Sequence, residues 1–131
     1  MKGYVADIGQ ETKTNTNFRK VLYTGHHSQL VLMSLKPGED IGAEVHPNVD
    51  QFFRFEQGTG QIVIDASVHE IKAEFAAIVP AGAEHNVINT GTEDLRLYTI
   101  YSPAEHQDGI ARVTKADAIA QPEEFDGKTT E

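Results

Sequence analysis

Cysteine is absent from the sequence, and basic residues are few. Without cysteine the chain has neither a disulfide framework nor a thiolate metal site, so any metal must be bound by nitrogen and oxygen ligands. The 11 Lys and Arg residues are outnumbered by 20 Asp and Glu residues, which gives a formal net charge of -9. The sequence shows no basic face of the kind that binds nucleic acid, and we therefore expect no nucleic-acid partner.

Long apolar runs are absent as well. The longest, Ala76–Val79, is far shorter than a membrane span, and the first residues, MKGYVADIGQ, lack the apolar stretch of a signal peptide. We therefore expect a cytoplasmic protein that does not associate with membranes. The 131 residues, of which 39% are hydrophobic, suit a single domain with its own core.

The sequence does contain a series of short apolar runs separated by Gly, Pro, Asn and Asp. Such runs at regular spacing predict the strands of a sandwich or a small barrel, and thus an all-β fold. A hairpin is expected at Gly58–Gly60, because one run ends there and the next begins. The runs comprise Leu30–Leu35, Gln51–Phe55, Gln61–Ile64, Ala76–Val79, Val87–Ile88 and Leu95–Tyr101.

The two ends of the chain differ from this middle part. Residues 1–29 are more polar and form an N-terminal extension, which we expect to add a strand along the barrel or a partner. Residues 30–103 form the barrel, and residues 104–131 form a C-terminal loop, a short helix and an acidic tail. Thr114–Gln121 predicts that helix, with Thr114 as N-cap and Asp117 at the capping-box position. The tail after Pro122 is expected to be mobile.

The stretch EVHPNVDQFFRFEQGTG, which begins at Glu44, holds the first group of polar residues with a clear spacing. Glu44 and His46 are two residues apart and share one face of a strand. After the following bend, Gln51 shares a face with Phe53 and Phe55. Three polar side chains on the inner face of a phenylalanine-rich strand are costly unless each has a partner. A bound metal would satisfy all three.

A second group lies downstream in VPAGAEHNVIN, which ends at Asn89. Pro80 and Gly82 predict a turn, and His85 opens the next strand on the same face as Asn89. We interpret Asn89 as a structural turn residue.

Together the two groups resemble the two sequence motifs of the cupin superfamily. The first motif is a Gly, five residues, His-x-His, three or four residues, Glu, six residues and Gly, and this register is kept by Gly38, Glu44, His46, Gln51 and Gly58. The second motif, Pro-x-Gly-x-x-His-x-x-x-Asn, is met by Pro80, Gly82, His85 and Asn89.

Two ligand positions depart from the family pattern, since Glu44 replaces a His and Gln51 replaces a Glu. Asp50 is an alternative to Gln51, but it breaks the six-residue step to Gly58 and lies on the opposite face of the strand. The resemblance implies a cupin jelly-roll β-barrel (double-stranded β-helix) with the N-terminal extension and short C-terminal helix described above. It also implies one metal ion bound by Glu44, His46, Gln51 and His85.

This ligand set constrains the metal. Two imidazoles and two oxygens with one formal negative charge suit Zn, Fe, Mn, Ni or Co as the divalent ion. Calcium and magnesium would take more oxygen ligands. The same four residue types hold zinc in cupin-type phosphomannose isomerases, where the acid and the amide occupy exchanged positions.

The chain is similar to small single-domain cupins of the cupin_2 type, often described as mannose-6-phosphate isomerase-like. This favours a metal-dependent, isomerase-like enzyme that acts on a small sugar or hydroxy acid, with Glu44 and His85 as the catalytic residues that exchange a proton. One alternative is a metal-dependent dioxygenase. The other is a cupin that binds a small molecule without catalysis.

The remaining polar residues are interpreted as structural or exposed. Arg54 is expected to point outward into a salt bridge. His106, in the loop SPAEHQDG after the last long strand, is expected to be a solvated loop histidine, with a loop that covers the barrel mouth as the alternative. Tyr101 is expected to pack in the core. Three further histidines lack any partner spacing and are assigned to the surface: His26, His27 and His69.

We expect a homodimer, because an open sandwich with a strand-like extension leaves edges that pair with another copy. Small cupins commonly pair through exposed strands, and the resemblance implies the same here. Sedimentation equilibrium at micromolar concentration should show twice the 14.4 kDa mass of the chain. A single species of 14.4 kDa would contradict this prediction.

Overall fold

A computed structural model describes all 131 residues. Most of the chain is extended, with two short helices. The elements are α1 (Ile8–Thr14), β1 (Arg19–Thr24), β2 (Gln29–Leu35), β3 (Glu44–Val45), β4 (Asp50–Gln57), β5 (Thr59–Ile64), β6 (Ser67–Lys72), β7 (Ala76–Val79), β8 (Glu84–Ile88), β9 (Leu95–Ser102), β10 (Ala111–Arg112) and α2 (Lys115–Ala120). Neither helix has the length and apolar character needed to cross a membrane.

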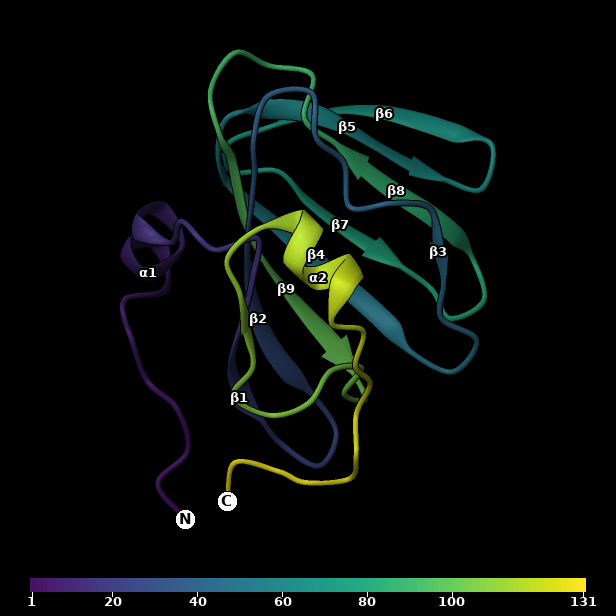
Figure 1. Ribbon diagram of the computed structural model, residues 1–131. Helices are drawn as coiled ribbons and strands as arrows, with labels where there is room; N and C mark the ends of the chain where they lie inside the picture. The colour runs from purple at the N-terminus through teal and green to yellow at the C-terminus, as the bar shows by residue number, and fades with distance from the viewer.

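The strands form two antiparallel sheets that enclose the core. The larger sheet has the order β10-β1-β2-β9-β4-β7, and the smaller one has the order β3-β8-β5-β6. Figure 1 shows the two sheets facing each other, with α2 in front of the space between them. This arrangement confirms the predicted all-β jelly-roll barrel, and it places the inner faces of both sheets around one interior.

Strand alternation determines which side chains enter that interior. On β4, Gln51, Phe53 and Phe55 are buried, whereas Arg54 is partly exposed and pairs with Glu56 at 3.1 Å. Phe53 and Phe55 belong to the main core cluster and stack in parallel with ring centroids 6.1 Å apart. The period-two pattern in the sequence therefore predicted correctly which side chains of β4 point into the interior.

The hairpin between β4 and β5 depends on glycine. Gly58 has a φ of +92°, and a Cβ there would lie 2.8 Å from the carbonyl oxygen of Asp94. Both the positive φ and the close approach require a residue without a side chain. The second motif ends in another structural residue, since the Asn89 side-chain amide donates to the carbonyls of Leu35 and Glu93. This confirms Asn89 as a structural residue.

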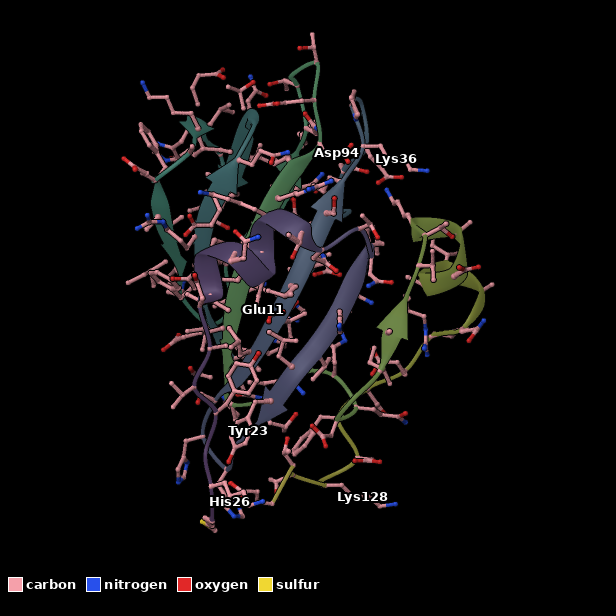
Figure 2. All side chains as sticks on the ribbon, turned by 90° about the vertical axis from the view of Figure 1, so that its left-hand side faces the viewer. Glu11, Tyr23, His26, Lys36, Asp94 and Lys128 are labelled. Carbon is pink, nitrogen blue, oxygen red and sulfur yellow. The ribbon has the colours of Figure 1, made fainter.

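Residues 1–29 contain both a helix and a strand. The Asp7 side chain caps α1 by accepting a hydrogen bond from the Gln10 amide. Figure 2 shows α1 lying across the outer face of the larger sheet, with Glu11 turned to the solvent. β1 pairs with β2 on one side and β10 on the other, so it is an internal strand of that sheet.

The C-terminal segment corrects one expectation. The predicted helix is present as α2, and the Thr114 side chain accepts from the Asp117 amide as expected. The tail beyond it, expected to be mobile, is instead held along the barrel. The Phe125 amide donates to Glu105 O and the Thr130 amide donates to Thr24 O, both at 2.9 Å. An acidic and polar tail is expected to stay disordered, because it buries too little apolar surface to compensate for the entropy lost on ordering. Here backbone hydrogen bonds to distant segments offset that loss.

Candidate functional site

Three strands bring the predicted metal ligands together. Glu44 on β3 is the direct cross-strand neighbour of His85 on β8, so both side chains project from the same face of the smaller sheet. His46 follows β3 by one residue. Gln51 comes from β4 of the facing larger sheet, where its partner in register is Tyr101 of β9.

The donor atoms of Glu44, His46 and His85 lie within 4.8 Å of one another. Both histidines are buried, with 9% of His46 and 4% of His85 exposed, while Glu44 is partly exposed. The two imidazole centroids are 5.3 Å apart. A group of two nitrogens and one carboxylate at this spacing can converge on a single metal ion.

Each imidazole is held from behind by an acceptor. His46 Nδ1 lies 3.3 Å from Oε1 of Glu105, and His46 Nε2 lies 3.2 Å from Oε2 of Glu44. His85 Nδ1 lies 3.2 Å from the carbonyl oxygen of Ala83, which leaves His85 Nε2 directed into the site. Metal-binding histidines typically donate the second ring N–H to a carboxylate or a backbone carbonyl. The surroundings of both rings therefore fit a metal ion bound through Nε2.

Gln51 lies beside this cluster with a fixed amide orientation. Its Nε2 donates to the Thr99 hydroxyl at 2.9 Å, and that hydroxyl donates to the carbonyl of Phe52 at 2.8 Å. Its Oε1 consequently faces His85 Nε2, at 3.0 Å. The amide oxygen is thus directed at the position that a metal ligand would need.

Asp50, the alternative to Gln51, lies elsewhere. Asp50 is exposed, and its Oδ1 accepts a hydrogen bond from the Ala81 amide at 2.8 Å. Its carboxylate therefore supports the turn before β8, on the face of β4 opposite to Gln51.

The charges in the site shift the pKa values of two of these residues. Burial raises the pKa of Glu44, but its hydrogen bond with His46 and the nearby charges of His46 and Arg19 bring it below the usual value. The hydrogen bonds to Glu105 and Glu44 outweigh burial and raise the pKa of His46 to about 9. Without a metal, His46 is therefore a protonated bridge between two carboxylates.

A metal must displace that proton, and this gives a pH-dependent prediction. Because the pKa of His46 is raised to about 9, metal binding near neutral pH should release a proton, and affinity should increase with pH up to about pH 9. NMR titration of the histidine ring nitrogens in metal-free protein measures the pKa directly. Glu105→Gln replaces the charged acceptor of the strongest of these hydrogen bonds by a neutral one and should lower the pKa of His46. Titration of wild-type His46 near its ordinary value of 6.5 would contradict this prediction.

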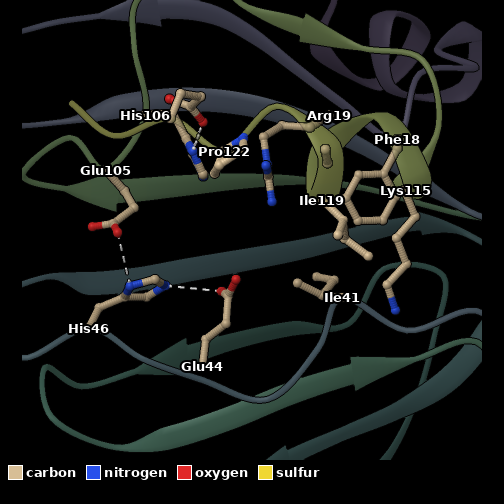
Figure 3. A pocket seen from close by; sticks show the side chains of 12 residues that line it. Phe18, Arg19, Ile41, Glu44, His46, Glu105, His106, Lys115, Ile119 and Pro122 are labelled. Carbon is tan, nitrogen blue, oxygen red and sulfur yellow. Dashed lines mark hydrogen bonds and ion pairs between the residues drawn. The ribbon is translucent and has the colours of Figure 1, made fainter. Parts of the chain in front are cut away.

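A pocket of about 250 Å³ opens beside Glu44 and His46 (Figure 3). Its other walls come from residues that sequence reasoning did not assign to the site. They are contributed by the start of β1 and the residue before it, the loop after β9, α2 and the segment after α2, and include Phe18, Arg19, Glu105, His106, Lys115, Ile119, Pro122 and Glu123.

His106 is a correction to the sequence prediction. It is buried, with 7% of the residue exposed, rather than solvated. Its Nδ1 lies 2.6 Å from Oε1 of Glu123 and its Nε2 lies 3.2 Å from the hydroxyl of Tyr101. The Tyr101 ring in turn contacts His46 edge-on, with centroids 5.9 Å apart. The carboxylate of Glu123, from the C-terminal segment, holds His106 in place. The loop after β9 therefore forms a wall of the pocket.

Of the residues that were missed, only Arg19 could have been found from the sequence. Arg19 is two residues before Val21, which is in the core, so strand parity places both on the inner face. Nothing in the local sequence marks Glu105 or Glu123. The remaining histidines behave as expected, since His26, His27 and His69 are exposed.

Comparison with known proteins shows matches along most of the chain. The Cupin domain family matches residues 31–101. The uncharacterized protein YrkC of Bacillus subtilis is 50% identical over 91% of this chain and 67% of its own length. An uncharacterized protein of Acanthamoeba polyphaga mimivirus is 44% identical over 81% of this chain and 69% of its own.

Solved structures show the same fold. A crystal structure of a Bacillus halodurans protein superimposes with a TM-score of 0.90, at 44% sequence identity, and the match covers 92% of this chain and 96% of that one. The helices and the C-terminal segment outside residues 31–101 are therefore part of an architecture that this relative largely shares.

Proposed function

The chain belongs to the cupin family, whose domain spans residues 31–101, and from this we propose that it binds one divalent transition-metal ion. Glu44, His46 and His85 are the proposed ligands, with the amide oxygen of Gln51 as a fourth donor. The observation that carries the proposal is the convergence of the three donor atoms within 4.8 Å, with each histidine oriented from behind. Nitrogen and oxygen donors in this ratio favour Zn, Fe, Mn, Ni or Co.

We further propose that the site is that of an isomerase-like enzyme acting on a small hydroxy acid or sugar. When bound, the metal would act as a Lewis acid toward a substrate oxygen. The residues around it orient and protect the reacting groups. Glu105 holds the His46 ring, and the buried Tyr101 closes the inner wall of the site against water.

Glu44 and His85 were predicted to exchange a proton in such a reaction, and because His106 lines the pocket whereas His85 does not, we propose Glu44 and His106 for this role. Glu44 is partly exposed, and its carboxylate faces the pocket (Figure 3). His106 also lines the pocket, and its Nδ1 is engaged by Glu123 at 2.6 Å, which fixes the orientation of the ring. An isomerase needs a base and an acid within reach of one substrate, and these two residues lie on opposite walls of the cavity.

The test begins with elemental analysis of the purified protein, followed by substrate screening after loading with the metal found. Interconversion of an aldose and a ketose, or of hydroxy-acid isomers, without oxygen uptake would support the isomerase proposal. Oxygen consumption that depends on Fe(II) would identify a dioxygenase instead. Ligand binding without turnover would identify a binding cupin. Absence of any bound metal, even after loading with each of the five ions, would reject the proposed function.

A further inference from the structure

Arg19 is the one arginine whose side chain forms neither a hydrogen bond nor an ion pair. Arg54 and Arg96 pair with acidic neighbours, and Arg112 donates to backbone carbonyls. The Nε of Arg19 is buried and has no acceptor in the protein. Its guanidinium lies near the ring of Phe18, 5.5 Å from the centroid.

The position of Arg19 in the sheet directs this guanidinium into the pocket. Arg19 on β1 is opposite Met33 on β2, whose side chain belongs to the core, so both lie on the inner face. Figure 3 shows the guanidinium entering the pocket from the wall opposite Glu44. The pocket therefore has two of the proposed metal ligands, Glu44 and His46, on one side and the Arg19 guanidinium on the other.

The other charged groups around the pocket already have partners. Glu44 and Glu105 flank His46, at 3.2 and 3.3 Å. Glu123 contacts His106 at 2.6 Å. Lys115 forms an ion pair with Asp40. Of the charged side chains that line the pocket, Arg19 alone has its donors unused.

An arginine in this situation is suited to one kind of ligand group. A partly buried charge without a partner is costly, and a guanidinium forms its strongest contacts with carboxylates and phosphates, through two parallel hydrogen bonds. The cavity of about 250 Å³ lies below the usual range of ligand sites, about 300 to 1,000 Å³, which favours a compact acid over a sugar phosphate.

We propose that Arg19 binds a carboxylate of the substrate, so that the pocket selects a small hydroxy acid with a second carboxylate. One end of this acid lies at the proposed metal site of Glu44, His46 and His85, and the other end lies at Arg19. This inference rests on the proposed function, because it takes the metal site as the other anchor point. It narrows the substrate class from sugars and hydroxy acids to dicarboxylates.

The alternative role for Arg19 is that of an internal counter-ion. Its charge contributes to lowering the pKa of both Glu44 and Glu123. In that case its removal would weaken metal binding and stability, and would affect charged and neutral ligands alike. A carboxylate-binding role predicts instead a loss that depends on the charge of the ligand.

Binding of malate and of malamate distinguishes the two roles of Arg19. Malamate is malate with an amide in place of the carboxylate that is distant from the hydroxyl. Both have the same hydroxy-acid end and nearly the same shape, but only malate presents the second charge. Calorimetric titration of metal-loaded wild type should show tighter binding of malate. Arg19→Met should weaken malate binding by about tenfold to a hundredfold, which is the usual range for a charge-assisted contact. Malamate binding should be unchanged, and Arg19→Lys should restore part of the malate affinity.

Arg54→Met serves as the matched control, because Arg54 lies on the outer face of β4 and is paired with Glu56. It should change neither titration. Metal content and melting temperature, measured on each variant, report folding separately. Equal losses for malate and malamate in Arg19→Met, or no loss, would overturn the inference, as would failure of metal-loaded wild type to bind malate.

Metal content distinguishes failure of the proposed function from failure of this inference. If wild type holds no metal, the proposed function is rejected, and the malate titration is then compared between metal-free wild type and Arg19→Met. Charge-dependent loss there still supports Arg19 as the carboxylate site, and equal binding overturns it. If phosphate competes with malate more strongly than acetate does, the recognised group is a phosphate and the dicarboxylate assignment is wrong.

Discussion

Replacing both His46 and His85 by alanine should leave the protein without transition metal, while wild type should purify with up to one ion per chain. The two imidazoles are the two nitrogen donors of the site, and their Nε2 atoms are the groups directed at its centre. Changes in residues that merely support metal ligands cost about tenfold to a hundredfold in affinity, so loss of both imidazoles should cost more. Elemental analysis and competition with a chelator measure the effect.

The control replaces histidines that are exposed and remote from the site. His26→Ala together with His69→Ala should leave metal content unchanged. Because His46 and His85 are buried, their truncation also removes packing, so circular dichroism of each variant is needed to show that the barrel is intact. Full metal content in a folded double variant would show that the site is wrongly assigned.

Gln51→Glu should bind metal more tightly than wild type, by about tenfold or more, because an anionic oxygen replaces a neutral one. With Glu44 as the single anionic ligand, a divalent ion keeps a net charge of one, and the substitution reduces this to zero. The ion should then polarise a substrate oxygen less, so activity should fall although a larger fraction of the sites holds metal. Titration with Zn or Co, with a chelating dye as competitor, measures the affinity.

The contact with Thr99 should make the Gln51→Glu variant less stable than wild type in the absence of metal. Gln51 Nε2 donates to the Thr99 hydroxyl, which itself donates to Phe52 O. A glutamate cannot donate there, so the hydroxyl must turn toward the new carboxylate or leave one oxygen without a partner. The variant should therefore lose about 1 kcal/mol of stability in the absence of metal, and recover it when metal is added.

Asp50→Asn is the matched control for the Gln51 variant. Asp50 is exposed and accepts from the Ala81 amide, and asparagine can also accept that bond, so metal affinity should not change. If Asp50→Asn lost metal while Gln51→Glu bound it with unchanged affinity, Asp50 would be the ligand. The assignment of β4 to its register would then be wrong.

The features that the sequence predicted correctly depend on short-range patterns. The alternation of Gln51, Phe53 and Phe55 specifies the inner face of β4, because a strand presents every second residue to the same side. Thr114 specifies the start of α2, because a hydroxyl at the N-cap satisfies a free backbone amide. The same alternation places Glu44 and His46 on one face of their segment, and Gln51 and Asp50 on opposite faces of β4.

The features that were missed depend on contacts between segments far apart in the chain. His106 is an ordinary loop histidine in its local sequence, and it becomes buried only because Glu123 reaches it from beyond α2. The tail is acidic and polar, yet Thr130 is bonded to Thr24 at the far end of the chain. Arg19 was inferable from strand parity, but its lack of a partner appears only once the surrounding side chains are placed.

The proposed ligands and the C-terminal residues that cover them are also synthesised at different times. The proposed ligands are complete at His85, whereas His106 and Glu123 follow later in the chain. Translation runs from the N-terminus, so the ligands leave the ribosome before the segment that encloses them. We therefore expect the donors to be accessible to a metal ion until this last segment has packed, so that the ion need not displace α2 and the residues after it.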